Sequence, residues 1–133
     1  MATNAVVTCQ NLNALGARRR RTLGLVGAAG AVAWFAGLVA VRAPALAFVT
    51  VALPAWSAAL GLLQARERTC VRLAALGVAE TEDAPRKVEG DELVAIRAKA
   101  ARINRRAILI ALVIGALAIL LGGIARGITT QSS

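Results

Sequence analysis

The sequence contains no histidine and only two cysteines, Cys9 and Cys70, among its 133 residues. Histidine is the side chain that most often acts as an acid or base near neutral pH, and it is also a common metal ligand. Two cysteines are too few for a disulfide framework, and alone they cannot supply the four ligands of a structural zinc site. These shortages predict a protein that is not an enzyme and that holds no cofactor or metal ion.

Binding motifs are also scarce. The glycine-rich stretches GAAGAV and LGGIARG lie in or at the end of apolar runs and follow no strand, so they are not typical of phosphate-binding loops. Glu80, Glu82 and Asp83 lack the loop spacing of an EF-hand, and we interpret them as a solvated turn rather than a calcium site. The basic segment 65–106 has no aromatic residue and no nucleic-acid motif. We therefore expect neither a nucleic acid nor a small-molecule substrate as partner.

Charge is missing from three long apolar runs. The chain is 58% hydrophobic, compared with roughly 45–50% in soluble domains. A helix of 20 residues is about 30 Å long, which matches the hydrocarbon core of a bilayer. The sequence therefore predicts an all-α integral membrane protein with three transmembrane helices, at Thr22–Val41, Pro44–Gln64 and Ala107–Ala125. Because these spans hold no ionisable group, a proton or ion pathway within one chain is not expected.

Basic residues flank these runs unevenly and predict the topology. The net charge is +9, and segment 65–106 carries all seven acidic and ten of the sixteen basic residues. The positive-inside rule then predicts a cytoplasmic basic segment 1–21, a two-span hairpin 22–64, a cytoplasmic segment 65–106, a third span 107–125 and an outer polar tail 126–133. The cytoplasmic anchors would be Arg18, Arg19, Arg20, Arg21, Arg102, Arg105 and Arg106.

The arginine run has two other interpretations, a cleaved signal peptide ending near Ala45-Leu46-Ala47 and a twin-arginine export signal. Both fit less well, because the first apolar run is too long for a signal peptide, a second run follows it, and no soluble cargo comes after. Arginine outnumbers lysine fourteen to two, which suggests a GC-rich bacterial genome and hence a bacterial inner membrane.

Small or polar residues recur at alternating spacings of three and four in each span. Such residues let helices approach closely within lipid, and this period predicts a compact left-handed bundle. Pro54 is expected to kink the second span, with the freed carbonyl satisfied by Ser57 or by a neighbouring helix. The residues expected at helix contacts are Gly30, Gly37, Pro54, Ser57, Gly61, Gly115 and Gly122.

Segment 65–106 reads as two helical extensions. Ala65–Leu76 is rich in helix formers and stops at Gly77, so the second span is expected to continue as one long helix. After a break at 78–90, Asp91 is expected to cap a helix that runs into the third span. Its apolar face would be Leu93, Ile96, Ala100, Ile103 and Ala107. The extensions would pack as a cytoplasmic antiparallel hairpin. The alternative is that residues 91–106 form an interfacial helix that lies on anionic lipid.

The N-terminal residues and the thiols allow more than one interpretation. Residues 1–17 are more typical of a frayed tail than of a short interfacial helix. Cys9 is interpreted as a plain reduced thiol, with a lipidated or cluster-binding cysteine as the alternative. Cys70 is interpreted as a small apolar core residue facing Leu93 and Ile96. Alternatively, nearby arginines lower its pKa and make it reactive.

Three functions remain open. The first is a small non-catalytic membrane protein that serves as an accessory, assembly or scaffold subunit, with the bilayer and other membrane subunits or itself as partners. The second is an oligomeric channel or transporter component, in which Thr50, Ser57 and the Pro54 kink would surround an axis. The third is a thiol-dependent sensor at the cytoplasmic face that uses Cys9 and Cys70.

Overall fold

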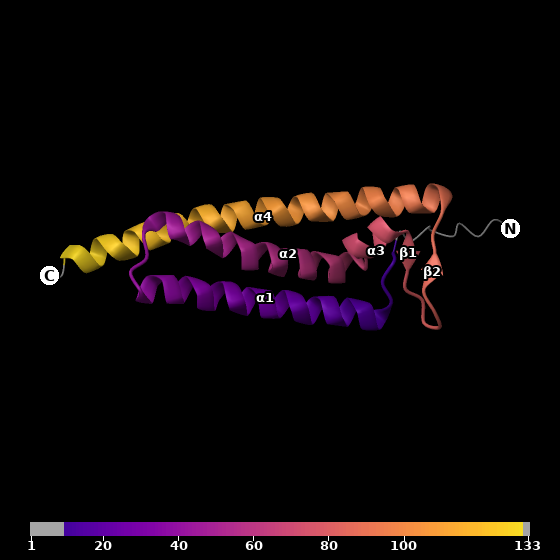
Figure 1. Cartoon of the computed structure of the whole chain (residues 1–133), viewed down its shortest axis with the longest axis horizontal. Helices are drawn as coiled ribbons and strands as arrows, with labels where there is room; N and C mark the ends of the chain where they lie inside the picture. Colours follow the sequence, from indigo (N-terminus) through magenta and orange to yellow (C-terminus); the bar gives the residue numbers. More distant parts are fainter. Residues whose placement is uncertain (1–9, 132–133) are drawn as a thin grey trace.

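A computed structural model describes residues 10–131, which are mainly helical and form a molecule elongated in one direction (Figure 1). Three segments are long and apolar enough to cross a membrane, namely α1, the η1–α2 segment and α4. The expectation of an all-α chain with three such helices is therefore confirmed. In chain order the elements are α1 (Ala14–Ala40), the 3₁₀ helix η1 (Ala45–Val51), α2 (Ala52–Glu67), α3 (Val71–Leu76), β1 (Val78–Ala79), β2 (Arg86–Lys87) and α4 (Gly90–Gln131).

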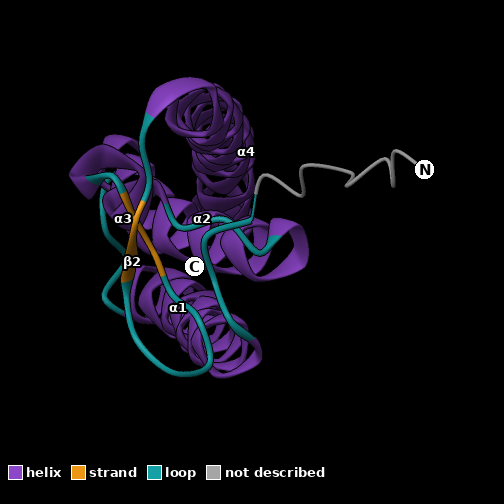
Figure 2. Cartoon of the chain, turned by 90° about the vertical axis from the view of Figure 1, so that its right-hand side faces the viewer, coloured by secondary structure: helices purple, strands orange, loops and turns teal. Residues whose placement is uncertain are grey.

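α2 is the central helix of the three. It packs against both α1 and α4, whereas α1 and α4 touch each other little. Figure 1 shows α2 between the other two, and the end view in Figure 2 likewise separates α4 from α1. The spans therefore form an open row, and the expectation of a compact bundle has to be corrected.

α1 begins eight residues earlier than the predicted span. The side chain of Asn13 caps it, because Asn13 Oδ1 accepts a hydrogen bond from the Gly16 backbone N–H at 2.7 Å. Such a cap satisfies one of the amide groups that the first turn leaves without a partner. The four arginines therefore lie within the helix rather than before it.

The segment before α1 is docked rather than frayed. The backbone N–H groups of Asn11 and Leu12 both donate to the Arg68 carbonyl at 3.1 Å, and the Glu80 N–H donates to the Asn11 carbonyl at 2.9 Å. Asn11 and Leu12 are buried in this contact. The prediction of a frayed tail is therefore wrong for the described residues from 10 to 17, and residues 1–9 lie outside the described part of the chain.

Pro54 does not kink a continuous helix. The chain runs as the 3₁₀ helix η1 after Pro44 and changes to α-helix at Ala52, so Pro54 falls in the first turn of α2. A first turn does not need the N–H that proline lacks, whereas the interior of a longer helix would. The change of helix type upstream takes the place of the predicted kink.

The second span also does not continue into α3. α2 ends at Glu67, its C-cap residue Arg68 adopts a left-handed conformation with φ 48°, and α3 starts at Val71. Lys99 of α4 donates to the Glu67 carbonyl at 3.1 Å and lies 3.4 Å from the Glu67 carboxylate. A cation near the exposed carbonyls of a helix C-terminus stabilises that end, so the break has a partner that local helix propensity did not reveal.

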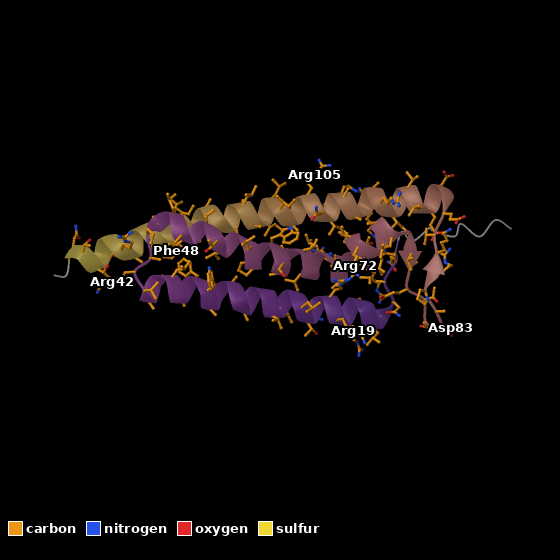
Figure 3. All side chains as sticks on the ribbon, in the orientation of Figure 1. Arg19, Arg42, Phe48, Arg72, Asp83 and Arg105 are labelled. Carbon is orange, nitrogen blue, oxygen red and sulfur yellow. The ribbon has the colours of Figure 1, made fainter. Side chains whose placement is uncertain are left out.

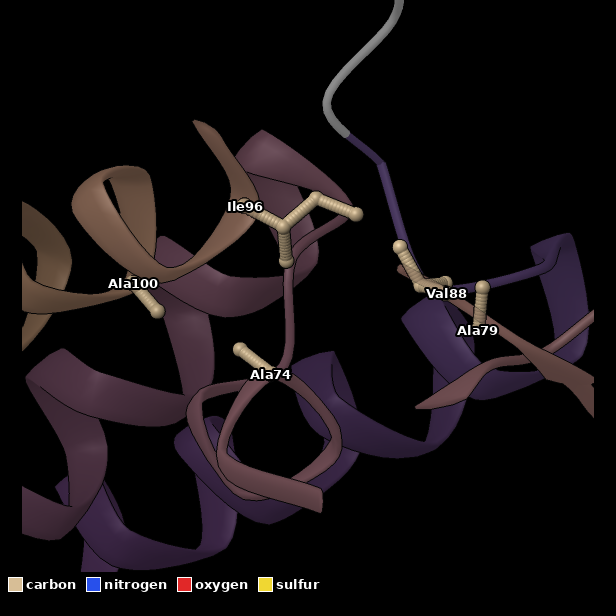
Figure 4. Close-up of a cluster of buried hydrophobic side chains, with 5 residues drawn as sticks. All are labelled: Ala74, Ala79, Val88, Ile96 and Ala100. Carbon is tan, nitrogen blue, oxygen red and sulfur yellow. The ribbon is translucent and has the colours of Figure 1, made fainter. Parts of the chain in front are cut away.

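α3 packs against the first turns of α4, and Gly77 ends it as predicted, with φ 67°. Five buried side chains form the local core (Figure 4), which are Ala74, Ala79, Val88, Ile96 and Ala100. Arg97 donates to the carbonyls of Ala74 and Ala75, both at 3.2 Å, and so caps the end of α3.

The break between α3 and α4 contains one short antiparallel pair, in which Val78 is opposite Lys87 and Ala79 is opposite Arg86. α4 starts at Gly90, so Asp91 lies in the first turn rather than at the cap position expected for it. The Arg86 guanidinium donates two hydrogen bonds to the Glu92 carboxylate, from Nη2 to Oε1 at 2.6 Å and from Nη1 to Oε2 at 3.2 Å. This hydrogen bonding, together with the carboxylate charge, raises the pKa of the exposed Arg86 guanidinium.

α4 is one helix of 42 residues. It runs without interruption from Gly90 through the third apolar run, as the sequence predicts. It continues past Ala125, where the predicted third span ends, so most of the tail predicted from residue 126 is helical. The hydroxyl groups of Thr129 and Thr130 accompany this extension, because they donate to the carbonyls of Ala125, Arg126 and Gly127.

Candidate functional site

The contact between α1 and α2 is closest at three glycines. A Cβ added to Gly61 would lie 2.8 Å from the Gly24 backbone nitrogen, and one added to Gly24 would lie 2.8 Å from the Leu62 backbone nitrogen. A Cβ on Gly27 would lie 3.0 Å from the Ala58 nitrogen. Real Cβ atoms essentially never lie closer than 3.0 Å to backbone, so glycine is needed at Gly24 and Gly61, whereas a Cβ at Gly27 would require Ala58 to move slightly.

Gly30 and Gly37 do not take part in this contact. A Cβ on either would meet nothing within 4 Å, and Ala33 and Ala40 of the same stripe are also exposed. The stripe predicted for the first span therefore faces away from the other two spans. The face that packs instead is formed by Gly24, Gly27, Ala31, Phe35 and Leu38.

The stripe predicted on the third span faces inward. A Cβ on Gly115 would lie 3.1 Å from Ala52 Cβ, and one on Gly122 would lie 2.7 Å from the Phe48 ring. On the second span, Gly61 is buried and Pro54 is half-buried, whereas Ser57 is exposed. The structure thus brings Gly61, Gly115 and Gly122 to helix contacts and leaves Gly30, Gly37 and Ser57 at the surface.

The arginines predicted as anchors lie on two helices. Arg18, Arg19 and Arg21 of α1 are exposed, and so are Arg102, Arg105 and Arg106 of α4. In Figure 3, Arg19 and Arg105 point outward from opposite sides of the molecule. Arg42 lies near the end of the molecule at which the chain finishes. The 20 residues between Arg21 and Arg42 carry no charge, and all but the last of them belong to α1, which gives an uncharged length of about 30 Å.

Arg20 differs from its neighbours because it turns inward to Cys70. Its Nη2 donates to Cys70 Sγ at 3.0 Å. The Cys70 residue is only 1% exposed, and Asn11 holds its backbone on both sides. Cys70 N–H donates to Asn11 Oδ1 at 2.6 Å, and Asn11 Nδ2 donates to the Cys70 carbonyl at 3.0 Å.

Gln64 and Thr69 are the other buried polar residues at this end of α2. In the part of the chain that the structure describes, Gln64 Oε1 is buried without a hydrogen-bond partner. Cys70 is thus buried, as its interpretation as a core residue predicts, and its sulfur also accepts the hydrogen bond from Arg20. Cys9 lies outside the described residues, so the hypothesis that uses both thiols stays a prediction.

The arrangement offers groups that donate hydrogen bonds or allow close helix packing. Its described groups are guanidinium donors, one enclosed thiol and an exposed stripe of small residues, and residues 10–131 contain no group of three or more metal-ligating side chains. Comparison with models of protein families, with curated proteins and with solved structures found no match for this chain.

Proposed function

We propose that this chain is a small non-catalytic membrane protein that serves as an accessory, assembly or scaffold subunit of a larger membrane complex. The membrane is a bacterial inner membrane, with the N-terminus and segment 65–106 in the cytoplasm and the C-terminus outside. The uncharged belt between Arg21 and Arg42 supports this placement, because its length matches a hydrocarbon core. The excess of arginine at one end supports the orientation.

The observation that carries the proposal is the outward-facing stripe of α1, formed by Gly30, Ala33, Gly37 and Ala40. A face that meets only lipid has no need of glycine, which weakens a helix interior by about 1 kcal/mol relative to alanine. Small residues are instead typical of faces on which a second helix packs closely within the bilayer. The stripe therefore suits a transmembrane helix of another subunit.

The test is the native mass of the tagged protein after extraction from its own membranes in mild detergent, with the co-purifying proteins identified. We expect a defined heteromeric complex, and we expect Gly37→Leu to weaken it. Ala36→Leu is the matched control, because Ala36 is also exposed but lies about 100° away around the helix. A monomer without partners, or equal effects of the two changes, would contradict the proposal.

The second candidate is an oligomeric channel or transporter component. The exposed hydroxyl of Ser57 favours it, whereas the Thr50 hydroxyl already accepts a hydrogen bond from Trp34 Nε1 at 2.8 Å. A pure homo-oligomer in the same experiment, together with increased permeability of liposomes that contain it, would favour this candidate over the first.

A further inference from the structure

Four arginines surround one cavity at the predicted cytoplasmic end of the α1–α2 pair. The cavity has a volume of about 450 Å³ and is open to the outside. Two of the arginines come from the second turn of α1 and two from the end of α2, so their convergence depends on the close glycine contact of these helices. The lining residues are Ala14, Ala17, Arg18, Arg21, Leu62, Ala65, Arg66 and Arg68.

Among residues 10–131, these four guanidinium groups have no acidic partner. The ion pairs of the described residues are Lys99 with Glu67, Arg86 with Glu92 and Lys87 with Glu89, and the undescribed residues contain no acidic side chain. Four like charges around one cavity repel each other unless an anion lies between them. Arginine binds phosphate with two parallel hydrogen bonds, so a phosphate group is the anion that this set fits best.

A second cavity of about 450 Å³ lies among residues of α1, α2 and α4. Leu62 lines both cavities, and the second one has no polar side chain in its lining. It arises because α1 and α2 present mainly alanine here, which leaves space in front of two isoleucines of α4. Its lining residues are Ala28, Ala31, Val32, Ala55, Ala58, Ala59, Leu62, Leu63, Ile110 and Ile114.

We propose that the two cavities form one site for an anionic phospholipid, with its headgroup phosphate among the four arginines and an acyl chain in the alanine-lined groove. A soluble phosphate would fill only the first cavity, and a zwitterionic phospholipid would bring an ammonium group of its own next to the four arginines. The arginines lie just outside the predicted spans, at the depth of lipid headgroups, where basic pockets between helices bind anionic lipids. The inference rests on the proposed membrane placement but not on the proposed partner subunit.

The headgroup half is tested by native mass spectrometry of the detergent-purified full chain. Phosphatidylglycerol, cardiolipin and phosphatidylethanolamine with matched acyl chains are added in separate titrations. We expect one anionic lipid to stay bound at concentrations at which phosphatidylethanolamine does not. Arg18→Gln with Arg66→Gln is expected to weaken that binding about tenfold, as for the loss of charge-assisted hydrogen bonds.

The matched control is Arg102→Gln with Arg105→Gln, which removes the same charge from exposed positions on α4 that do not line the cavity. We expect its effect to be within about twofold, since charge outside the site acts only through screened long-range attraction. Equal losses in the two double variants would overturn the proposal, and so would equal retention of the zwitterionic lipid by the unchanged protein.

The acyl half is tested by Ala28→Phe, which fills the groove, against Ala36→Phe, which adds the same ring at an exposed position outside it. We expect only Ala28→Phe to weaken binding of the long-chain lipid, and we expect inorganic phosphate to compete poorly. If phosphate competes as well as the lipid and Ala28→Phe has no effect, the site is one for a soluble anion and the proposal is wrong.

The two proposals can fail separately. If the lipid washes off while the protein still co-purifies with a larger complex, the proposed lipid site is wrong and the proposed function stands. If the chain retains the lipid but has no protein partner, the proposed function is wrong and the proposed lipid site stands.

Discussion

α1 packs against the η1–α2 segment differently in its two halves. At the arginine end, Gly24 and Gly61 let the two backbones touch. Toward the Arg42 end, side chains hold the helices together, and the rings of Phe35 and Phe48 meet edge to face with centroids 5.3 Å apart. Both halves are rich in alanine and apolar residues, so composition does not distinguish them. What differs is which residue faces the neighbouring helix, and each half should therefore fail under a different kind of substitution.

The close half should tolerate added volume least. We expect Gly61→Leu to destabilise the purified chain by about 3 kcal/mol, the upper end for overpacking, because its side chain would collide with α1 backbone. Unfolding can be followed in mixed micelles through the fluorescence of the two tryptophans. Gly37→Leu is the control, since its side chain would project into open space. Similar losses from both changes would show that the glycine contact is not what holds this half together.

The half near Arg42 should be more sensitive to lost volume. Phe48 is 1% exposed and packs against Phe35, Gly122 and Ala118. We expect Phe48→Ala to cost about 2 kcal/mol, less than the roughly 3–5 kcal/mol of soluble cores, because lipid solvates the separated spans. The same unfolding assay measures it, with the exposed Leu46→Ala as control. A Phe48→Ala variant as stable as the control would mean that ring packing does not join these segments.

The smallest expected effect comes from the hydrogen bond between Trp34 and Thr50, which also belongs to the side-chain-packed half. A double-mutant cycle of Trp34→Phe and Thr50→Val should give a coupling of about 0.6 kcal/mol, the average for such bonds between membrane helices. Steric trapping in bicelles can resolve this value without tryptophan fluorescence. Strictly additive single changes would indicate that the bond contributes nothing to the pairing.

The features that the sequence predicted well are those encoded locally. Gly77 ends its helix because a left-handed residue is needed there, and the inward face of α4 follows a repeat that can be read from Ile96 through Gly122. The face of α1 that packs against the neighbouring helix could not be predicted in this way. Glycine and alanine occur around the whole helix. Which face of α1 becomes buried depends on where Gly61 and Phe48 pack against it.

The surroundings of Cys70 lay beyond sequence reasoning for a different reason. Asn11 reaches Cys70 across 59 residues, and Arg20 reaches it across 50. Neither residue differs in local pattern from its neighbours. The break after α2 was hidden as well, because residues 65–76 favour a helix and the cation that caps Glu67 comes from Lys99 on another helix.

The docking of the N-terminal segment has a consequence for the order of synthesis. Asn11 leaves the ribosome long before the turn around Arg68 and Cys70 exists, so it has to wait until the second span has been made. Its hydrogen bonds can form only once α1 and α2 lie side by side. The first described residues of the chain are therefore among the last to reach their final positions. Their attachment indicates that α1 and α2 have paired correctly.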